Sequence, residues 1–254
     1  MIFRIVASLL SLVLLAFAPA PVSAETVRVA HQAQFSPFIF VKDGKTQGLV
    51  ADILNAAAAR EGITIVFVPV SLADQLETLT NGTADALAPL GITPERLKSY
   101  DFTAALVVTG GALFVRSPRP APTGLAALAG KTIVTPRTGP FVAFIEQNFP
   151  DVRVVPTTDY VDSLDRVVSG QADAAALNIQ VGAGMVAASY SGRITVPSTM
   201  FEQVPLALAV TKGQHAELLG RLDAGLAAIR ADGTLKHIED EWKIQIAPLT
   251  GAVP

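Results

Sequence analysis

Short apolar runs alternate along this chain with longer stretches in which apolar residues recur every three or four positions. The short runs predict strands and the longer stretches predict amphipathic helices. Such alternation is typical of βαβ units with mainly parallel sheets, so the pattern predicts an α/β fold. The predicted strands are 27–30, 64–69, 84–88, 112–116, 132–135, 152–156, 172–177 and 206–211, and the predicted helices are 48–61, 72–80, 141–148, 163–169, 217–230 and 234–241.

One turn pattern occurs twice, as Asn81–Ala86 and as Ser169–Ala174. Each copy ends a predicted helix and opens a predicted strand. The glycine of each copy suits a left-handed helix cap, and we expect Asp85 and Asp173 to bind turn amides as structural residues. Two interpretations remain open: a common turn met twice, or two similar lobes that each contain one copy.

The first 24 residues have the pattern of a secretory signal peptide. Arg4 precedes an apolar run at 5–18, and the small residues Val22–Ala24 fit a cleavage site. The alternative is a retained membrane anchor, but the run is short for a span and two prolines follow it. The chain contains no cysteine, which excludes disulfides and a lipid-attached cysteine. We therefore expect a periplasmic protein that is not a lipoprotein.

Charge and composition exclude several classes of partner. Residues 25–254 number 254 − 24 = 230, and without Arg4 they hold 18 basic and 22 acidic residues, a net charge of −4. No basic run is present, so nucleic acid is not expected as a partner. The three histidines are scattered without metal-ligand spacing, so no metal or cofactor is expected. Nothing indicates an oligomer, and we expect a monomer.

The segment Gly91–Phe102 carries the clearest chemical signal. A predicted strand leads into Thr93, a suitable helix cap, and then Pro94, which suits a first helical turn. Arg96 follows one turn later and offers a fork of donors that fits a carboxylate. The segment therefore predicts a small-anion receptor at a helix N-terminus. The alternative is a surface arginine after an ordinary helix cap.

This segment resembles the "T-P-E-R … F" signature of the extracellular solute-binding proteins, family 3, which serve amino acid ABC transporters. The resemblance extends from Val27 to Lys243, and its strength lies in the order and spacing of several motifs. The other matching motifs are the first strand Val27–Ala30, the loop Phe35–Phe38, the helix start Gly48–Leu54, the closing strand Leu206–Lys212 and the final helices within Leu222–Lys243.

The resemblance implies the type II periplasmic-binding fold. Its two lobes each contain a mainly parallel sheet flanked by helices, and two antiparallel hinge strands join them. The proline-rich segment Ser117–Gly124 interrupts the chain where the first crossing is expected. The expected division is 1–24 as signal peptide, 25–114 plus 207–254 as a discontinuous lobe one, and 115–206 as an inserted lobe two.

The resemblance also implies a ligand site in the cleft between the lobes. Arg96 would bind the carboxylate of the ligand, together with backbone N–H groups near Gly91 and Thr93. Phe35 would cover the ligand, whereas alternation assigns Phe38 and Phe40 to the core. The lobe-two residues that the resemblance places at the same carboxylate are Thr138, Gly139 and Phe141.

Three positions depart from the family pattern. Asn178 stands where amino-acid binders usually have the aspartate that pairs with the ligand ammonium. Leu72 replaces a second stacking aromatic residue, and Gln32 replaces an acid. A buried ammonium without a charged partner is costly. The sequence therefore favours a ligand that has a carboxylate but lacks an α-ammonium, or holds it differently.

The first expectation for function is the binding component of an ABC importer, which captures an amino acid or related small carboxylate and presents it to a membrane permease. One alternative is an enzyme that resembles cyclohexadienyl dehydratases, with His31, Glu146 and Glu202 as candidate acids or bases. Another is a sensory partner that reports the ligand to a membrane receptor. No catalytic constellation is evident in the sequence, which favours a binding protein over an enzyme.

Overall fold

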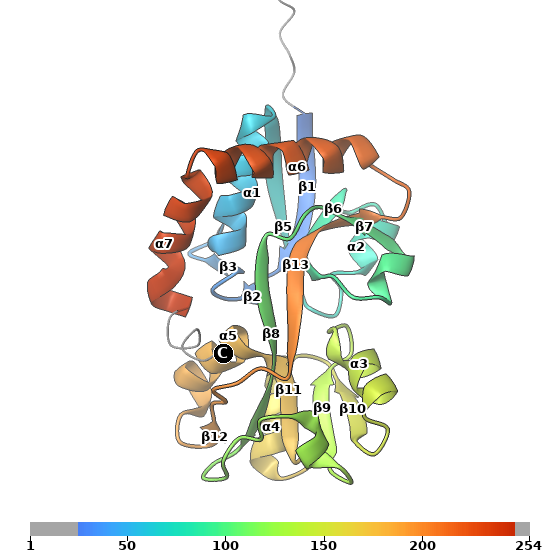
Figure 1. The fold of residues 1–254 in the computed structure, drawn as a ribbon, viewed down its shortest axis with the longest axis vertical. Helices are drawn as coiled ribbons and strands as arrows, with labels where there is room; N and C mark the ends of the chain where they lie inside the picture. Colours follow the sequence, from blue (N-terminus) through green and yellow to red (C-terminus); the bar gives the residue numbers. More distant parts are fainter. Residues whose placement is uncertain (1–24, 247–254) are drawn as a thin grey trace, which may run out of the picture.

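A computed structural model describes residues 25–246, which form two lobes joined by two long strands (Figure 1). These strands are β8 (Val107–Arg116) and β13 (Glu202–Thr211), and they pair antiparallel from Glu202 opposite Gly111 to Leu206 opposite Val107. Both continue into the sheets of the lobes, so one strand path reads β10-β9-β11-β8-β13-β6-β1-β5. The boundaries proposed from the sequence, 114/115 and 206/207, fall inside these two strands. The signal-peptide prediction lies outside the described residues.

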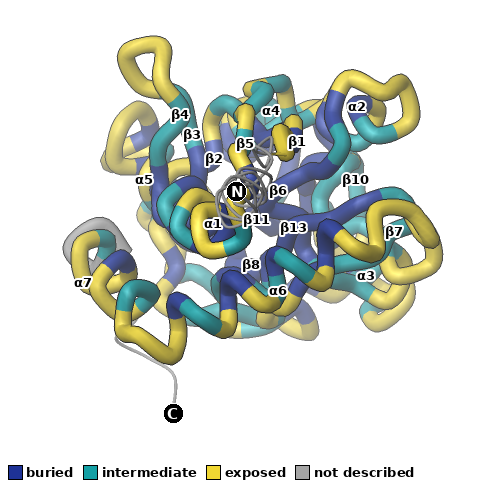
Figure 2. The backbone as a smooth tube through the Cα atoms, turned by 90° about the horizontal axis from the view of Figure 1, so that it is seen from above, coloured by how far each residue is buried: buried dark blue, intermediate teal, exposed yellow. Residues whose placement is uncertain are grey.

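Lobe one is built on three parallel strands in which β1 lies between β5 and β6. Helices α1 and α6 pack against each other, and α6 crosses the end of the lobe with its outer side exposed (Figures 1 and 2). The elements of this lobe are β1 (Glu25–Gln32), β2 (Gln34–Phe35), β3 (Ile39–Lys42), β4 (Lys45–Gln47), α1 (Leu49–Arg60), β5 (Ile63–Val70), α2 (Glu77–Thr80), β6 (Ala86–Gly91), β7 (Tyr100–Phe102), α6 (Ala216–Ala231) and α7 (Thr234–Ile246).

Lobe two repeats the parallel arrangement with β9 between β10 and β11. Its last parallel strand, β11, pairs antiparallel with β8. The elements are β9 (Thr132–Pro136), α3 (Phe141–Asn148), β10 (Arg153–Thr157), α4 (Tyr160–Ser169), β11 (Ala174–Asn178), α5 (Ile179–Met185) and β12 (Ile194–Thr195). The α/β class and the two-lobed arrangement predicted from the sequence are therefore confirmed.

The repeated turn has the same contacts in both lobes. The Asp85 carboxylate accepts the backbone N–H of Arg28 at 2.8 Å, and the Asp173 carboxylate accepts that of Thr132 at 3.0 Å. In each case the aspartate ties the turn to the first strand of its own lobe. The glycine of each turn has a positive φ, 72° in lobe one and 79° in lobe two. The two aspartates are structural as predicted, but the amides they bind lie in the first strand of each lobe and not in the turn.

Two helix predictions in lobe one were wrong. Of the helix predicted over 72–80, only α2 is present. Ser71 Oγ hydrogen-bonds with the Asp74 carboxylate and with the Asp74 N–H, and these bonds form a turn where the helix was expected to begin. The helix predicted after Thr93 is a single 3-10 turn, Arg96–Lys98. Thr93 does cap it, since its hydroxyl accepts the N–H of Arg96 at 3.2 Å. A turn this short has no substantial dipole, so the predicted helix-terminus contribution to anion binding is absent here.

Candidate functional site

A cavity lies between the lobes where the carboxyl ends of both sets of parallel strands face each other. Gln32 ends β1 and Gly91 ends β6 on one side, while Pro136 ends β9 and Asn178 ends β11 on the other, and all four line the cavity. Ligand sites in α/β proteins lie at this edge of the sheet. The space for centres of water-sized molecules is about 50 Å³, enough for a few waters or one small molecule.

Arg96 reaches the cavity from lobe one and contacts both lobes. Its guanidinium donates to the carbonyl oxygen of Gly91 at 3.0 Å and to that of Thr138, in lobe two, at 2.7 Å. A guanidinium has five N–H groups, so three remain for a ligand. Burial lowers the Arg96 pKa to about 10, which leaves the group charged at neutral pH. A Cβ at Gly91 would lie 2.7 Å from a Val204 methyl group and 3.0 Å from the Arg96 guanidinium, so a side chain there would force both to shift.

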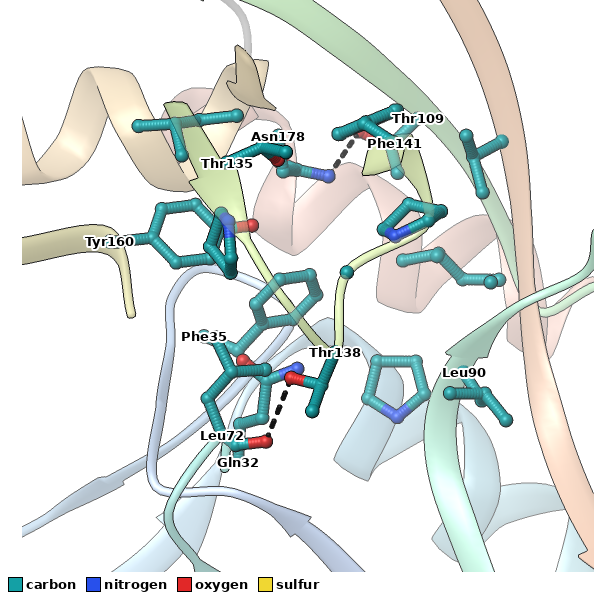
Figure 3. A pocket seen from close by; sticks show the side chains of 18 of the residues that line it. Gln32, Phe35, Leu72, Leu90, Thr109, Thr135, Thr138, Phe141, Tyr160 and Asn178 are labelled. Atoms are coloured by element: carbon teal, nitrogen blue, oxygen red, sulfur yellow. Dashed lines mark hydrogen bonds between the residues drawn. The ribbon is translucent and has the colours of Figure 1, made fainter. Parts of the chain in front are cut away.

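The loop after β9 closes the cavity through a second bond between the lobes. The Thr138 hydroxyl donates to the carbonyl oxygen of Leu72 at 3.1 Å, as the lower dashed line in Figure 3 shows. Thr138 therefore uses its carbonyl and its hydroxyl to hold the lobes together. Gly139 passes close to the carbonyl oxygen of Pro136, where a Cβ would approach to 3.0 Å.

Asn178 lies on the cavity wall, but its acceptor is already occupied. Its Oδ1 accepts the N–H groups of Gln180 and Val181 at the start of α5, at 3.1 and 3.2 Å. Its Nδ2 donates to the Thr109 hydroxyl at 3.0 Å, the upper dashed line in Figure 3. Both lone pairs of Oδ1 serve the helix cap, so in this structure the Asn178 side chain offers no free acceptor to a ligand ammonium.

The aromatic residues divide between cavity and core. Phe35 lines the cavity while its ring also packs on Phe38, at a centroid distance of 5.4 Å. Phe38 is buried as predicted. Phe40 is half-buried and meets Trp242 edge to face at 6.3 Å, so its assignment to the core holds only in part. Phe141 is the first residue of α3, so its backbone N–H has no partner within the helix. Its ring packs on Phe201.

Some predicted residues do not lie at this cavity. Thr93 lines a separate outer groove. His31 is fully buried beside the site, where its ring bonds the Gln32 carbonyl and the Thr46 hydroxyl at 2.8 and 2.9 Å. Glu146 is exposed on α3, and Glu202 lines the same groove as Thr93. The acids and bases considered for dehydratase chemistry are therefore not brought together.

Several cavity residues were not predicted from the sequence. Tyr160 lies just after β10, as Leu72 lies just after β5. Because these are equivalent strands of the two lobes, the predicted role of Leu72 could have pointed to Tyr160. Burial raises the pKa of the Tyr160 hydroxyl, which stays protonated. Gln75 was hidden within the wrongly predicted helix. The other unpredicted lining residues are Pro89, Leu90, Thr109, Thr135, Pro136, Pro140, Ala176, Leu177, Val204 and Leu206.

The cavity is electrostatically one-sided. Among the described residues that line it, Arg96 is the single charged side chain, and no carboxylate accompanies it. In the part of the chain that the structure describes, no group of three or more His, Cys, Asp or Glu residues is placed to hold a metal ion. The same described residues, 25–246, contain no helix that is both long and apolar enough to cross a membrane. Because the one charged side chain among the described lining residues is a cation, the cavity is suited to a small anion.

Comparisons with known proteins agree with this geometry. The virulence sensor protein BvgS of Bordetella bronchiseptica is 28% identical over 221 residues, covering 85% of this chain but 18% of that sensor. The putative amino-acid ABC transporter-binding protein PatH of Vibrio harveyi is 26% identical, covering 90% of this chain and 93% of PatH. A histidine kinase sensor domain with similarity to periplasmic binding proteins superposes with a TM-score of 0.77 at 25% identity, over 85% of this chain and 95% of that domain.

A comparison with models of whole protein families identifies the family of this chain. The model of the bacterial extracellular solute-binding proteins, family 3, matches residues 27–245. This range covers both lobes, both connecting strands and every residue that lines the cavity. This family consists of solute-binding proteins, and PatH and two arginine-binding relatives are named as binding proteins, not as enzymes. The chain belongs to the bacterial extracellular solute-binding proteins, family 3.

Proposed function

We propose that this protein captures a small carboxylate in the cavity between its lobes and presents the closed form to a membrane partner. The observation that carries the proposal is the isolated positive charge of Arg96 in a wall that is otherwise neutral. A buried cation is stabilised by an anionic ligand. The three N–H groups of Arg96 that remain after its bonds to Gly91 and Thr138 supply the contacts.

The ligand is proposed to be an amino acid or a related organic acid that enters while the lobes are apart. It docks on lobe one through Arg96, and the approach of lobe two then adds the loop Thr138–Phe141. In this proposal the N–H of Phe141, in the first turn of α3, donates to the same carboxylate. Closure excludes water, and each polar contact becomes stronger in the drier site. In this proposal β8 and β13, the two strands that join the lobes, act as the hinge.

The membrane partner is proposed to be an ABC permease, as for the relative PatH. A second candidate is a membrane receptor that reads the ligand-bound form, because the similar proteins also include BvgS and a histidine kinase sensor domain. The signal-peptide pattern of residues 1–24 supports a periplasmic location for either role. Uptake of labelled ligand into membrane vesicles that depends on this protein supports the permease; ligand-dependent binding to a sensor without uptake supports the receptor.

Thermal unfolding with matched ligands tests the proposed capture of a carboxylate. The mature protein is heated with amino acids and with the same acids lacking the amino group. A ligand at 100 times its Kd adds about 2.7 kcal/mol, or a rise in Tm of roughly 5–10 °C at this chain length. We expect the amine-free acids to raise the Tm at least as much as their amino acids, because no lining carboxylate is available for an ammonium.

Arg96→Ala supplies the decisive variant. We expect it to lose the ligand-induced rise in Tm, with a weakening of affinity of about 100-fold or more, since two charge-assisted hydrogen bonds contribute roughly 3–6 kcal/mol. Arg137→Ala is the matched control, because Arg137 is exposed beside the same loop and does not line the cavity. Carboxylate binding that survives in Arg96→Ala would disprove the proposed anion site.

A further inference from the structure

Gln75 holds an unpaired polar atom in the wall of the cavity. It lies in the turn between β5 and α2, is 2% exposed, and lines the cavity together with Arg96. Its side-chain Oε1 is the buried side-chain oxygen or nitrogen that has no hydrogen-bond partner among the described residues. Buried polar atoms without a partner are rare in folded proteins. The atom has almost no surface of its own on the cavity, so a ligand reaches it only when the Gln75 side chain turns toward the cavity. It is nevertheless the buried side-chain atom of the site that lacks a partner within the described part of the chain.

The backbone at Gln75 is fixed, so the unpaired oxygen does not result from a loose loop. The Thr78 hydroxyl donates to the Gln75 carbonyl oxygen at 2.6 Å, and the Glu77 N–H donates to the Asp74 carbonyl at 3.1 Å. On the opposite side of the cavity, Asn178, Thr109 and Thr135 have their hydrogen bonds within the protein. Gln75 thus differs from them in having acceptor capacity left over.

We infer that Gln75 is a specificity-determining residue, and that the ligand is a small carboxylate that also carries an uncharged hydrogen-bond donor, a hydroxyl or an amide N–H, which meets Gln75 Oε1. This inference rests on the proposed binding of the carboxylate by Arg96. The donor is uncharged because the lining residues include no carboxylate, and a buried ammonium held by a neutral amide alone is costly. The small cavity of this closed form favours a ligand of a few carbon atoms.

The inference makes hydroxy acids and acid amides the favoured class over plain fatty acids and amino acids. An acceptor that is buried without a donor forfeits its hydration, so a site of this kind rejects analogues that lack the matching hydrogen. The expected preference for the donor-bearing acid over its plain counterpart is about 5- to 100-fold.

The test uses one four-carbon scaffold and calorimetric Kd values with the mature protein. The probes are butanoate, its 2-, 3- and 4-hydroxy derivatives, 4-amino-4-oxobutanoate, 2-aminobutanoate and 2-oxobutanoate. We expect at least one hydroxy acid or the amide to bind at least about fivefold more tightly than butanoate.

In Gln75→Leu this preference should fall below about twofold while butanoate binds as well as before or better, because the unpaired acceptor is gone. In Gln75→Glu the preference should move to 2-aminobutanoate, since a carboxylate pairs with an ammonium.

Stability separates this role from a merely structural one. Gln75→Leu removes a buried acceptor that has no partner, so the Tm of the free protein should stay the same or rise. A structural glutamine would lower the Tm on the same change. Gln171→Leu, at an exposed position in lobe two, is the matched control and should change neither ligand preference nor Tm.

Three results would overturn the inference. One is a wild-type protein that binds butanoate as tightly as every donor-bearing acid, which would leave water as the partner of Gln75. Another is tightest binding of 2-oxobutanoate, which offers only acceptors and would mean that Gln75 donates through its amide nitrogen. The third is an equal loss for all probes in Gln75→Leu. In all three, binding that depends on Arg96 still stands; if no probe binds the wild type, the carboxylate proposal fails and this inference fails with it.

Discussion

The two lobes contribute unequally to the cavity, although both present the carboxyl ends of three parallel strands to it. Lobe one supplies Arg96, which has unused N–H groups, and Gln75, which has an unused oxygen. Lobe two and its adjoining strands supply Asn178, Thr135 and Thr109, whose hydrogen bonds are made within the protein. Residues of the same polar type therefore differ in function, because the partners they already have decide what they can offer a ligand.

Within the proposed function, this difference leads us to assign ligand recognition to lobe one and closure to lobe two. A polar group that caps a helix or bonds a neighbouring strand stabilises its own lobe and has little capacity left. Thr138 fits this division, since both of its bonds across the cavity reach groups of lobe one. Variants that add a charge to lobe two, weaken its closure or remove its internal bonds test the division.

Among these lobe-two variants, the largest expected effect comes from adding a charge with Asn178→Asp. An aspartate keeps one oxygen for the α5 cap and presents a second one near the cavity. We expect the affinity ratio of 2-aminobutanoate to butanoate to rise about tenfold or more, because an ammonium gains a charged partner. Calorimetric Kd values for the two acids measure the change. An unchanged ratio would show that position 178 does not determine the preference.

Weakening closure has the next largest effect. Thr138→Val removes the hydroxyl that bonds the Leu72 carbonyl but keeps the carbonyl that Arg96 contacts. One neutral hydrogen bond contributes about 1 kcal/mol, so affinity for a bound carboxylate should fall about fivefold, mainly through faster dissociation. Stopped-flow release of ligand measures this rate. Thr158→Val, at an exposed position of lobe two, serves as the control and should leave the rate unchanged.

Removing an internal bond of lobe two should change stability rather than recognition. Thr135→Val deletes the hydroxyl that donates to the Ala176 carbonyl at 2.8 Å. We expect the free energy of unfolding to fall by about 0.5–1.5 kcal/mol while Kd stays within about twofold. Urea unfolding and calorimetry measure the two quantities. A loss of affinity larger than the loss of stability would place Thr135 among the ligand contacts.

The smallest expected effect is a pH dependence that originates in lobe one. Burial lowers the pKa of His31 below its ordinary value of about 6.5. The unfolded chain therefore takes up this proton first, so the contribution of His31 to stability is present above about pH 6.5 and is lost as the pH falls below it. His31→Asn should flatten the decline in Tm between pH 6.5 and 5.

Much of the fold and part of the site could be predicted from the sequence. The parallel strands, α1, α3, α6 and the twin aspartate turns follow from local periodicity and turn residues, which act over a few neighbours. Nine of the ten site residues predicted from the family resemblance line the cavity, and Thr93 does not. Binding by those nine stays a prediction. Gln75 could not be found, because the Ser71–Asp74 turn that orients it replaces a helix that periodicity favoured.

The sequence by itself determined the α/β class, the two copies of the turn, the absence of cysteine and the presence of an arginine after a threonine cap. These depend on residue type and on spacing within a few positions. Tertiary structure decided which polar groups remain free. Arg96 meets Thr138 from 42 positions away, and Asn178 meets Thr109 from 69. Hydrogen-bond capacity is shared among whichever groups folding brings together, and that sharing leaves N–H groups of Arg96 and the side-chain oxygen of Gln75 without protein partners among the described residues.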